Sequence, residues 1–175
     1  MLKTILLTVV LIVAALLIYA ATRPDSFRLE RSTTVAAPPD KVFALINDLR
    51  QFNTWNPFAK IDPDQVVTYE AVTAGPGAAY RWLGPKSGAG RMEITQVQPP
   101  QRIAIKLDFS KPFEAHNQVE FTITAEGAGS RVTWAMFGPM AYLNKLISVF
   151  VSMDKMVGDD FERGLASLKA MAEAR

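Results

Sequence analysis

The stretch FRLERSTTVAAPPDKVFALINDL, residues 27–49, changes its apolar spacing part-way along and sets the order of the first two elements. Its first half alternates apolar and polar residues, which predicts a strand that ends at Pro38 and Pro39. A helix should begin there, because proline and aspartate are common in the first turn. Its apolar residues recur at helical spacing: Val42, Phe43, Leu45, Ile46 and Leu49.

The next ten residues, QFNTWNPFAK (51–60), place three aromatic rings around a proline. Pro57 should end a helix after Trp55 or Asn56, because its ring is incompatible with the preceding helical turn. Large rings at a turn are unusual, since turns are normally on the surface. Two interpretations follow for Trp55 and Phe58: they plug a core, or they form the wall of a pocket.

Beyond this turn the spacing changes to that of strands, and the sequence predicts six of them in succession. Pairs of glycine and proline, and the segment GAGS, separate the segments as turns. Short links of this kind favour an antiparallel meander. The predicted strands are QVVTYEA (65–71), AAYRW (78–82), GRMEITQVQ (90–98), RIAIKLDF (102–109), NQVEFTITAE (117–126) and RVTWAMF (131–137).

The last block, roughly residues 140–174, contains no proline and returns to helical spacing, with Gly158 as a bend or a close contact. The sequence therefore predicts an α+β fold: strand, helix, six antiparallel strands and a long C-terminal helix. A single sheet needs one face covered, and the long helix is the natural cover. A strongly curved sheet around that helix leaves a cavity between them.

The first 22 residues form a separate apolar segment. Leu2 to Ala21 are 20 residues with one charge, Lys3, and as a helix they span roughly 30 Å, the thickness of a bilayer core. A transmembrane anchor or uncleaved signal is predicted, with a cleaved signal peptide and a buried core helix as alternatives. The predicted layout is anchor 1–22, linker 23–26 and ligand-binding domain 27–175.

The charges that flank this segment give opposing indications of its orientation. Lys3 and the terminal amine favour a cytoplasmic N-terminus, whereas Arg23, Arg28 and Arg31 favour the reverse. Because the segment resembles a signal-anchor, we expect a single-pass membrane protein with its domain on the extracytoplasmic side.

Composition excludes several classes of function. The 175 residues carry a net charge of +2 with both signs interspersed, so nucleic-acid binding is not predicted. There is no cysteine, which removes disulfides, thiolate metal sites and cysteine nucleophiles. The single histidine, His116, and the scattered carboxylates match no metal-ligand spacing. We therefore predict no metal and no cofactor.

Candidates for acid–base chemistry are equally sparse. By strand alternation His116 falls on the solvated face with Gln118 and Glu120, while Asn117 falls on the apolar side. Asp62 and Asp64 flank Pro63 and are typical of a turn. The glycines between residues 75 and 90 lack a phosphate-loop pattern and are interpreted as turns and close backbone approaches. No catalytic residue is assigned.

Several motifs in order along the chain resemble the START-like, polyketide-cyclase-type SRPBCC superfamily, which has a helix-grip fold. They are STTVAAPPDKVFALINDL (32–49), WNPFAKIDP (55–63), the glycines and Trp82 between residues 75 and 90, VTW (132–134) and DFERGLASLK (160–169). The resemblance covers residues 28–172. It implies a hydrophobic cavity between a curved sheet of about seven strands and the C-terminal helix, without fixing a reaction.

The leading hypothesis is binding of a hydrophobic small molecule or lipid at the membrane, without catalysis. A cyclase or aromatase that uses the same cavity is one alternative, and a membrane-tethered interaction module with a filled core is another. The candidate ligand-binding residues alternate toward the apolar side of the strands or lie on the facing helix and turn. They are Trp55, Phe58, Tyr80, Trp82, Met92, Ile105, Leu107, Asn117, Phe121, Trp134, Met153 and Met156.

Overall fold

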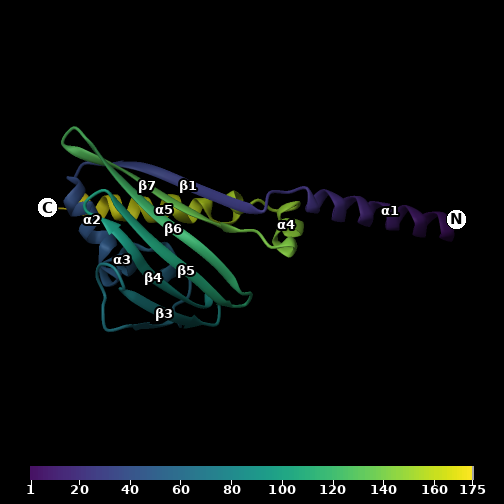
Figure 1. Ribbon diagram of the computed structural model, residues 1–175, viewed down its shortest axis with the longest axis horizontal. Coiled ribbons are helices and arrows are strands. Elements are labelled where there is room, and N and C mark those ends of the chain that lie inside the picture. The colour runs from purple at the N-terminus through teal and green to yellow at the C-terminus, as the bar shows by residue number, and fades with distance from the viewer. Residues whose placement is uncertain (175) are drawn as a thin grey trace.

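The computed structural model describes residues 1–174, with every side chain in that range except those of Met153 and Met156. Seven strands and several helices follow the predicted alternation (Figure 1). In chain order they are α1 (Leu2–Ala21), β1 (Ser26–Val35), α2 (Pro39–Asn47), α3 (Leu49–Trp55), the 3-10 helix η1 (Pro57–Lys60), β2 (Val66–Tyr69), β3 (Ala79–Gly84), β4 (Gly88–Gln98), β5 (Arg102–Lys111), β6 (Ala115–Glu126), β7 (Gly129–Pro139), α4 (Tyr142–Ser148) and α5 (Met153–Glu173).

All seven strands belong to one antiparallel sheet in the order β1-β7-β6-β5-β4-β3-β2. Strands β2 to β7 form the predicted meander, each one paired with its neighbour in the chain. The first strand closes the sheet by pairing with the last, from Ser26 opposite Pro139 to Val35 opposite Ser130. This pairing places the start of β1 and the end of β7 at the same end of the sheet.

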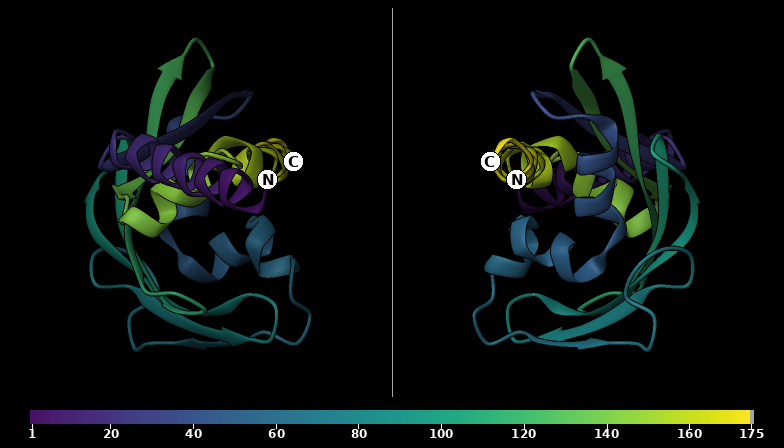
Figure 2. Two further views of the ribbon diagram at one scale, coloured as in Figure 1. Left: turned by 90° about the vertical axis from the view of Figure 1, so that its right-hand side faces the viewer. Right: turned by 90° about the vertical axis from the view of Figure 1, so that its left-hand side faces the viewer.

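The sheet curves around the helices, as seen along the long axis of the molecule in Figure 2. Helix α5 runs along β1 and also contacts α2, α3 and η1. The predicted α+β helix-grip arrangement is confirmed. Alternate residues of the strands enter the core together with Phe52 of α3 and Phe161 and Leu165 of α5, all at most 2% exposed.

Two predicted helices are each divided in two. The first breaks at Asp48, which is extended and bridges to Ala74 of the neighbouring loop. The Asp48 carboxylate then caps α3 by accepting from the backbone N–H of Arg50 at 2.8 Å. The C-terminal block breaks between Ser148 and Met153, where Ser152 caps α5. A polar residue that satisfies free N–H groups can begin a new helix without any change in apolar spacing.

Gly90 shows why the glycine-rich segment is needed here. A Cβ at Gly90 would lie 2.3 Å from the Trp82 ring and 2.4 Å from the carbonyl oxygen of Asp108. Gly88, the first residue of β4, adopts a positive φ of 69° where the chain leaves the turn from β3. The interpretation of this segment as turns and close approaches is confirmed.

Helix α1 projects from the sheet as a separate element (Figure 1). It has 20 residues and a mean hydropathy of 2.8, so this N-terminal helix is long and apolar enough to span a membrane. Along its length the side chains are exposed, apart from Ala20 and the partly covered Leu16 at its domain end. The helix is therefore a candidate membrane anchor.

Candidate ligand-binding site

A cavity of about 240 Å³ lies between the concave face of the sheet, the segment α3–η1 and the middle of α5. Most of its lining is apolar, and five of the contributing rings are buried: Phe52, Tyr80, Trp82, Trp134 and Phe161. The apolar lining comprises Phe52, Phe58, Ala59, Ile61, Val67, Tyr80, Trp82, Met92, Leu107, Phe109, Val119, Trp134, Met136, Val157 and Phe161. The remaining residues are Asn53, Asn56, Gln65, Lys86 and Ser87.

Aromatic contacts fix the wall nearest α5. The rings of Trp134 and Phe161 are stacked with their centroids 4.1 Å apart. Phe58 packs edge-on against both of them, at 6.3 Å and 6.2 Å. Because each ring is held by its neighbours, this wall is rigid before any ligand arrives. The indole N–H of Trp134 is buried and has no acceptor among the described residues.

Trp55 and Phe58, which flank Pro57, have different positions. Phe58 lines the cavity. Trp55 is fully buried, packs against Phe52 at 4.7 Å, and donates from its indole nitrogen to the carbonyl oxygen of Leu45 at 2.9 Å. Helix α3 ends at Trp55, as predicted, and Pro57 begins η1 after the single residue Asn56. One ring therefore supports the core while the other faces the empty space.

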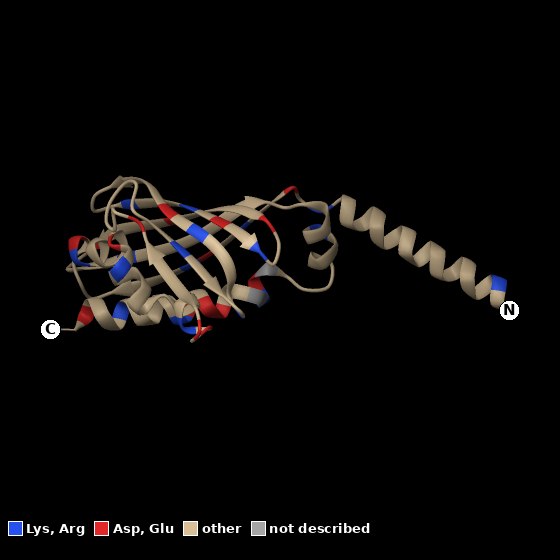
Figure 3. Ribbon diagram, turned by 90° about the horizontal axis from the view of Figure 1, so that it is seen from below, with Lys and Arg blue, Asp and Glu red and all other residues tan. Residues whose placement is uncertain are grey.

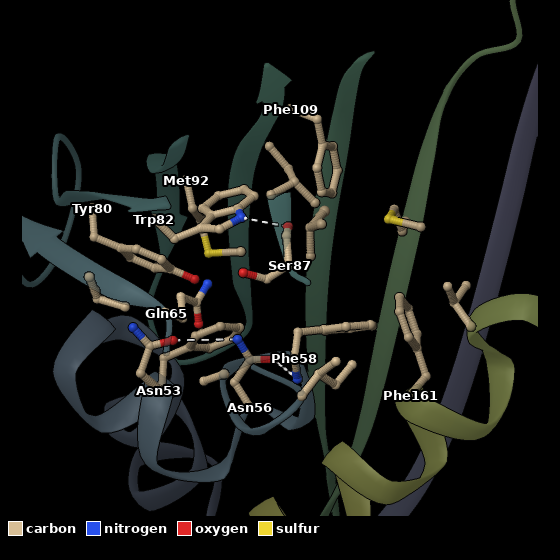
Figure 4. Close-up of a pocket in the computed structure, with 18 of the residues that line it drawn as sticks. Asn53, Asn56, Phe58, Gln65, Tyr80, Trp82, Ser87, Met92, Phe109 and Phe161 are labelled. Atoms are coloured by element: carbon tan, nitrogen blue, oxygen red, sulfur yellow. Dashed lines mark hydrogen bonds between the residues drawn. The ribbon is translucent and has the colours of Figure 1, made fainter. Parts of the chain in front are cut away.

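Neutral polar groups gather at the opposite side of the cavity from Phe161 (Figure 4). Asn53 and Asn56 are on one face of α3 and its end, and the amide of Asn56 donates to the Asn53 oxygen at 3.4 Å. The oxygen of Asn56 accepts from the N–H of Phe58 at 3.2 Å. Burial raises the pKa of Tyr80, so its hydroxyl remains protonated at neutral pH. With Gln65 these residues form a polar end that carries no charge.

The exposed part of the lining forms a rim where the 61–65 loop meets the turn between β3 and β4. Ile61 and Lys86 are the exposed residues here. The carboxylate of Asp62, which is 1% exposed, joins the two segments. It accepts from the N–H groups of Lys86 at 2.8 Å and Ser87 at 2.9 Å, and from the Ser87 hydroxyl at 3.0 Å. The turn-forming aspartate thus holds the rim together.

Replacing Asp62 by asparagine should loosen this rim. Hydrogen bonds from Ser87 and Lys86 lower the pKa of Asp62, so its stabilising effect is present above the ordinary aspartate pKa and is lost as pH falls through the lowered value. We expect Asp62→Asn to melt at a lower temperature than the wild type from pH 7 down to about pH 4, with the difference shrinking below that. Tryptophan fluorescence during heating would measure this. Asp64→Asn, at an exposed site, is the control; an equal loss there would contradict the assignment.

The structure brings together six of the predicted ligand-binding residues and separates the others. Phe58, Tyr80, Trp82, Met92, Leu107 and Trp134 line the cavity. Trp55, Ile105 and Phe121 are buried in the surrounding core without lining it. Asn117 is also buried, next to Gly138 of β7. The side chains of Met153 and Met156 are outside the described residues.

Sequence reasoning found Tyr80 but missed the amide residues of the polar end. Asn53, Asn56 and Gln65 come from a helix, a turn and a loop, and strand alternation gives no information about such positions. One signal was present: Asn53 and Asn56 are three residues apart, which places two amides on the same side of a helix that also carries Phe52. His116 lies on the outer face, as predicted, where Asp108 contacts its Nδ1 at 2.8 Å and raises its pKa.

The chain matches a known protein family over most of its length. Residues 26–173 match the family described as polyketide cyclase / dehydrase and lipid transport. The chain belongs to this family. The SRPBCC-type resemblance expected from the motifs is thereby confirmed. No curated protein shows significant sequence similarity to the chain.

Solved structures share the fold of this family member at low sequence identity. Protein Mll3558 from Rhizobium loti is 19% identical with a TM-score of 0.60, over 83% of this chain and 96% of that one. Protein CV1439 from Chromobacterium violaceum is 16% identical with a TM-score of 0.59, over 87% and 100%. DynU16, a putative protein in the dynemicin biosynthetic locus, is 17% identical with a TM-score of 0.58, over 87% of this chain and 48% of that one. At this identity the likeness shows the fold alone.

Proposed function

We propose that the domain binds a small, largely apolar and uncharged molecule that carries at least one oxygen, and that α1 holds the domain at a membrane. The observation that carries the proposal is the cavity itself, with apolar walls and a neutral polar end. Pockets for small molecules commonly combine these two features. The family to which the chain belongs, described in terms of polyketide cyclases and lipid transport, supports an apolar ligand.

The apolar wall supplies the affinity in this proposal. Burial of apolar surface contributes about 25 cal/mol per Å², so enclosing about 300 Å² of ligand gives roughly 7 kcal/mol before the costs of ordering. Rings that already pack against one another, such as Trp134 on Phe161, lose little further freedom when a ligand arrives. The walls therefore favour any apolar molecule of suitable size.

The polar end supplies selectivity. An ionised carboxylate moved into this space would lose its hydration, and the nearest charged lining residue, Lys86, is on the exposed rim. The Tyr80 hydroxyl is a neutral donor in the same region, because burial raises its pKa. We therefore expect an alcohol or ketone to bind more tightly than a carboxylate of the same chain length.

The geometry of the cavity favours ligand binding without catalysis over a cyclase or an interaction module. The titratable lining groups are Tyr80, whose raised pKa keeps its hydroxyl protonated and therefore unavailable as a base, and Lys86 at the rim. His116 is on the outer face of β6, away from the cavity, which gives a cyclase no histidine in the lining. An interaction module with a filled core would not contain a cavity of this volume.

Ligand titrations test the proposal, because Trp82 and Trp134 line the cavity and report on its contents through their fluorescence. We expect 1-decanol to bind more tightly than decanoate. We further expect Tyr80→Phe to weaken 1-decanol roughly three- to tenfold, the loss typical of one hydrogen bond, and to leave decane unchanged. If Tyr80→Phe lost affinity for decanol and decane equally, the Tyr80 hydroxyl would have no role in binding the ligand oxygen. An absence of response to all three probes would contradict ligand binding.

A further inference from the structure

Helix α4 lies beside the domain end of α1 rather than on the sheet (Figure 1). The hydroxyl of Tyr142, the first residue of α4, donates to the carbonyl oxygen of Leu17 in α1 at 2.9 Å. The approach to α4 is also fixed, since the N–H of Met140 donates to the carbonyl oxygen of Asp25 at 2.8 Å. The position of α4 relative to the candidate span is therefore set by direct contacts.

The outer side of α4 and of the turn that follows it is apolar and exposed. Phe150 is 71% exposed and Leu143 is 54% exposed, although neither has an obvious role in the fold. A contiguous exposed apolar patch normally marks a contact surface. We call this group the anchor-side patch; its members are Tyr142, Leu143, Ile147, Phe150 and Val151.

The patch itself contains no charged residue, although the exposed carboxylate of Asp25 lies beside α4. Lys145, the basic residue of α4, is only 7% exposed, and its ammonium pairs with the carboxylate of Asp25, whose own side chain is exposed. In Figure 3 charged residues of both signs are spread over the sheet, while α1 carries lysine only in its first turn. The strip formed by α1 and the anchor-side patch is therefore mostly apolar, with Asp25 as an exposed charge where the two meet.

A second exposed ring, that of Phe113, lies at the same end of the sheet as α4. Strand β5 ends and β6 begins beside the end of β7, because Phe109 pairs with Ala115 and Gln118 pairs with Phe137. The turn between β5 and β6 carries Phe113, which is 70% exposed. A bulky ring at the tip of a turn, on the side where α1 departs, is suited to contact the same surface as the patch.

We propose that the anchor-side patch and Phe113 rest on the surface of the lipid bilayer that α1 spans. This rests on the proposed role of α1 as a tether. Leu17 is four residues before the end of α1, about 6 Å along the helix, so α4 sits at the depth of the interfacial layer. Interfacial helices bury their apolar face roughly 5–10 Å into this layer, which is the depth available to α4 here.

This seating also orients the cavity. The turn between β3 and β4 lies at the membrane end of the sheet, since Gly84 pairs with Gly88 and Ala89 pairs with Lys111 at the end of β5. That turn contributes Lys86 and Ser87 to the rim of the cavity. A domain resting on the patch thus turns its rim toward the bilayer, where an apolar ligand concentrates.

Site-directed fluorescence on the full chain tests the proposal, and the chain's lack of cysteine makes single labels specific. Phe150→Cys and Phe113→Cys are labelled with an environment-sensitive dye and reconstituted in phosphatidylcholine vesicles with spin-labelled acyl chains. Val72→Cys is the control, because Val72 is 48% exposed in the loop at the opposite end of the sheet. We expect quenching by about half or more at 150 and 113, given the depth of an interfacial helix, and little at 72.

Introducing negative charge into the patch provides an independent check. Leu143→Glu together with Phe150→Glu should release the domain, so that quenching of a label at 113 falls toward that at 72 while the chain still floats with the vesicles. Quenching at 113 and 150 no greater than at 72, in a chain that floats, would overturn the bilayer contact and leave the tether intact. A chain that does not float would overturn the tether and this proposal with it.

Discussion

Phenylalanine in place of Val119 is expected to weaken 1-decanol binding at least about tenfold, which is 1.4 kcal/mol, while leaving the fold almost as stable as the wild type. Val119 lies on β6 and lines the cavity, so the added ring would occupy the space proposed for the ligand. Tryptophan fluorescence measures both quantities, by titration and by chemical denaturation.

The same substitution at Val132 is the matched control. Val132 lies on β7, is fully buried and does not line the cavity. An added ring at a packed position forces its neighbours apart, so Val132→Phe should cost about 1–3 kcal/mol of unfolding free energy. The contrast distinguishes an empty cavity from a solid core. A loss of stability at Val119 as large as at Val132 would contradict the cavity.

A second large effect is expected on α5. Gly164→Ala should destabilise the fold by about 1–3 kcal/mol, although alanine is the better helix former by about 1 kcal/mol. A Cβ at Gly164 would lie 2.6 Å from the ring of Trp134 and 2.9 Å from the Pro57 ring. Neither ring can move freely, because Trp134 is stacked on Phe161. Chemical denaturation of the variant measures the cost.

Gly158→Ala, six residues earlier on the same helix, should behave in the opposite way. Its Cβ would meet the end of the flexible Arg31 side chain at 2.5 Å, which can move aside at the expense of exposed ion pairs with Asp154 and Glu162. Such pairs contribute little, so the gain in helix propensity should leave this variant as stable as the wild type or more so. Equal losses at both glycines would show that contact with Trp134 does not decide the effect.

Much of the fold could be predicted because strand and helix spacing differ clearly in this chain. Alternation located the six strands of the meander, and Pro57 located the end of α3. The pairing of β1 with β7 was not predicted, because partners more than 90 residues apart leave no local signal. Asp48 and Ser152 divided two helices by capping the second half of each, an effect that apolar spacing does not reveal.

Apart from Phe58, which the aromatic turn at Pro57 indicated, the candidate site was predictable only where strands form it. Tyr80, Trp82 and Trp134 follow from alternation, because the concave face collects every second residue of each strand. Alternation cannot separate residues that face an empty space from those that face one another, so Ile105 and Phe121 were grouped with the lining although they are packed in the core. Loop and helix residues of the polar end require three-dimensional placement.

The central claim is that the cavity holds an apolar ligand, and the most direct test is to identify what the full chain carries. The wild type and Val119→Phe would be extracted into lipid nanodiscs in parallel and denatured, and the released small molecules analysed by mass spectrometry. Because both preparations contain the same lipids, only cavity contents should differ. We expect one recurring uncharged, oxygen-bearing apolar compound from the wild type that is depleted in Val119→Phe. Identical compounds in equal amounts from both would contradict the claim.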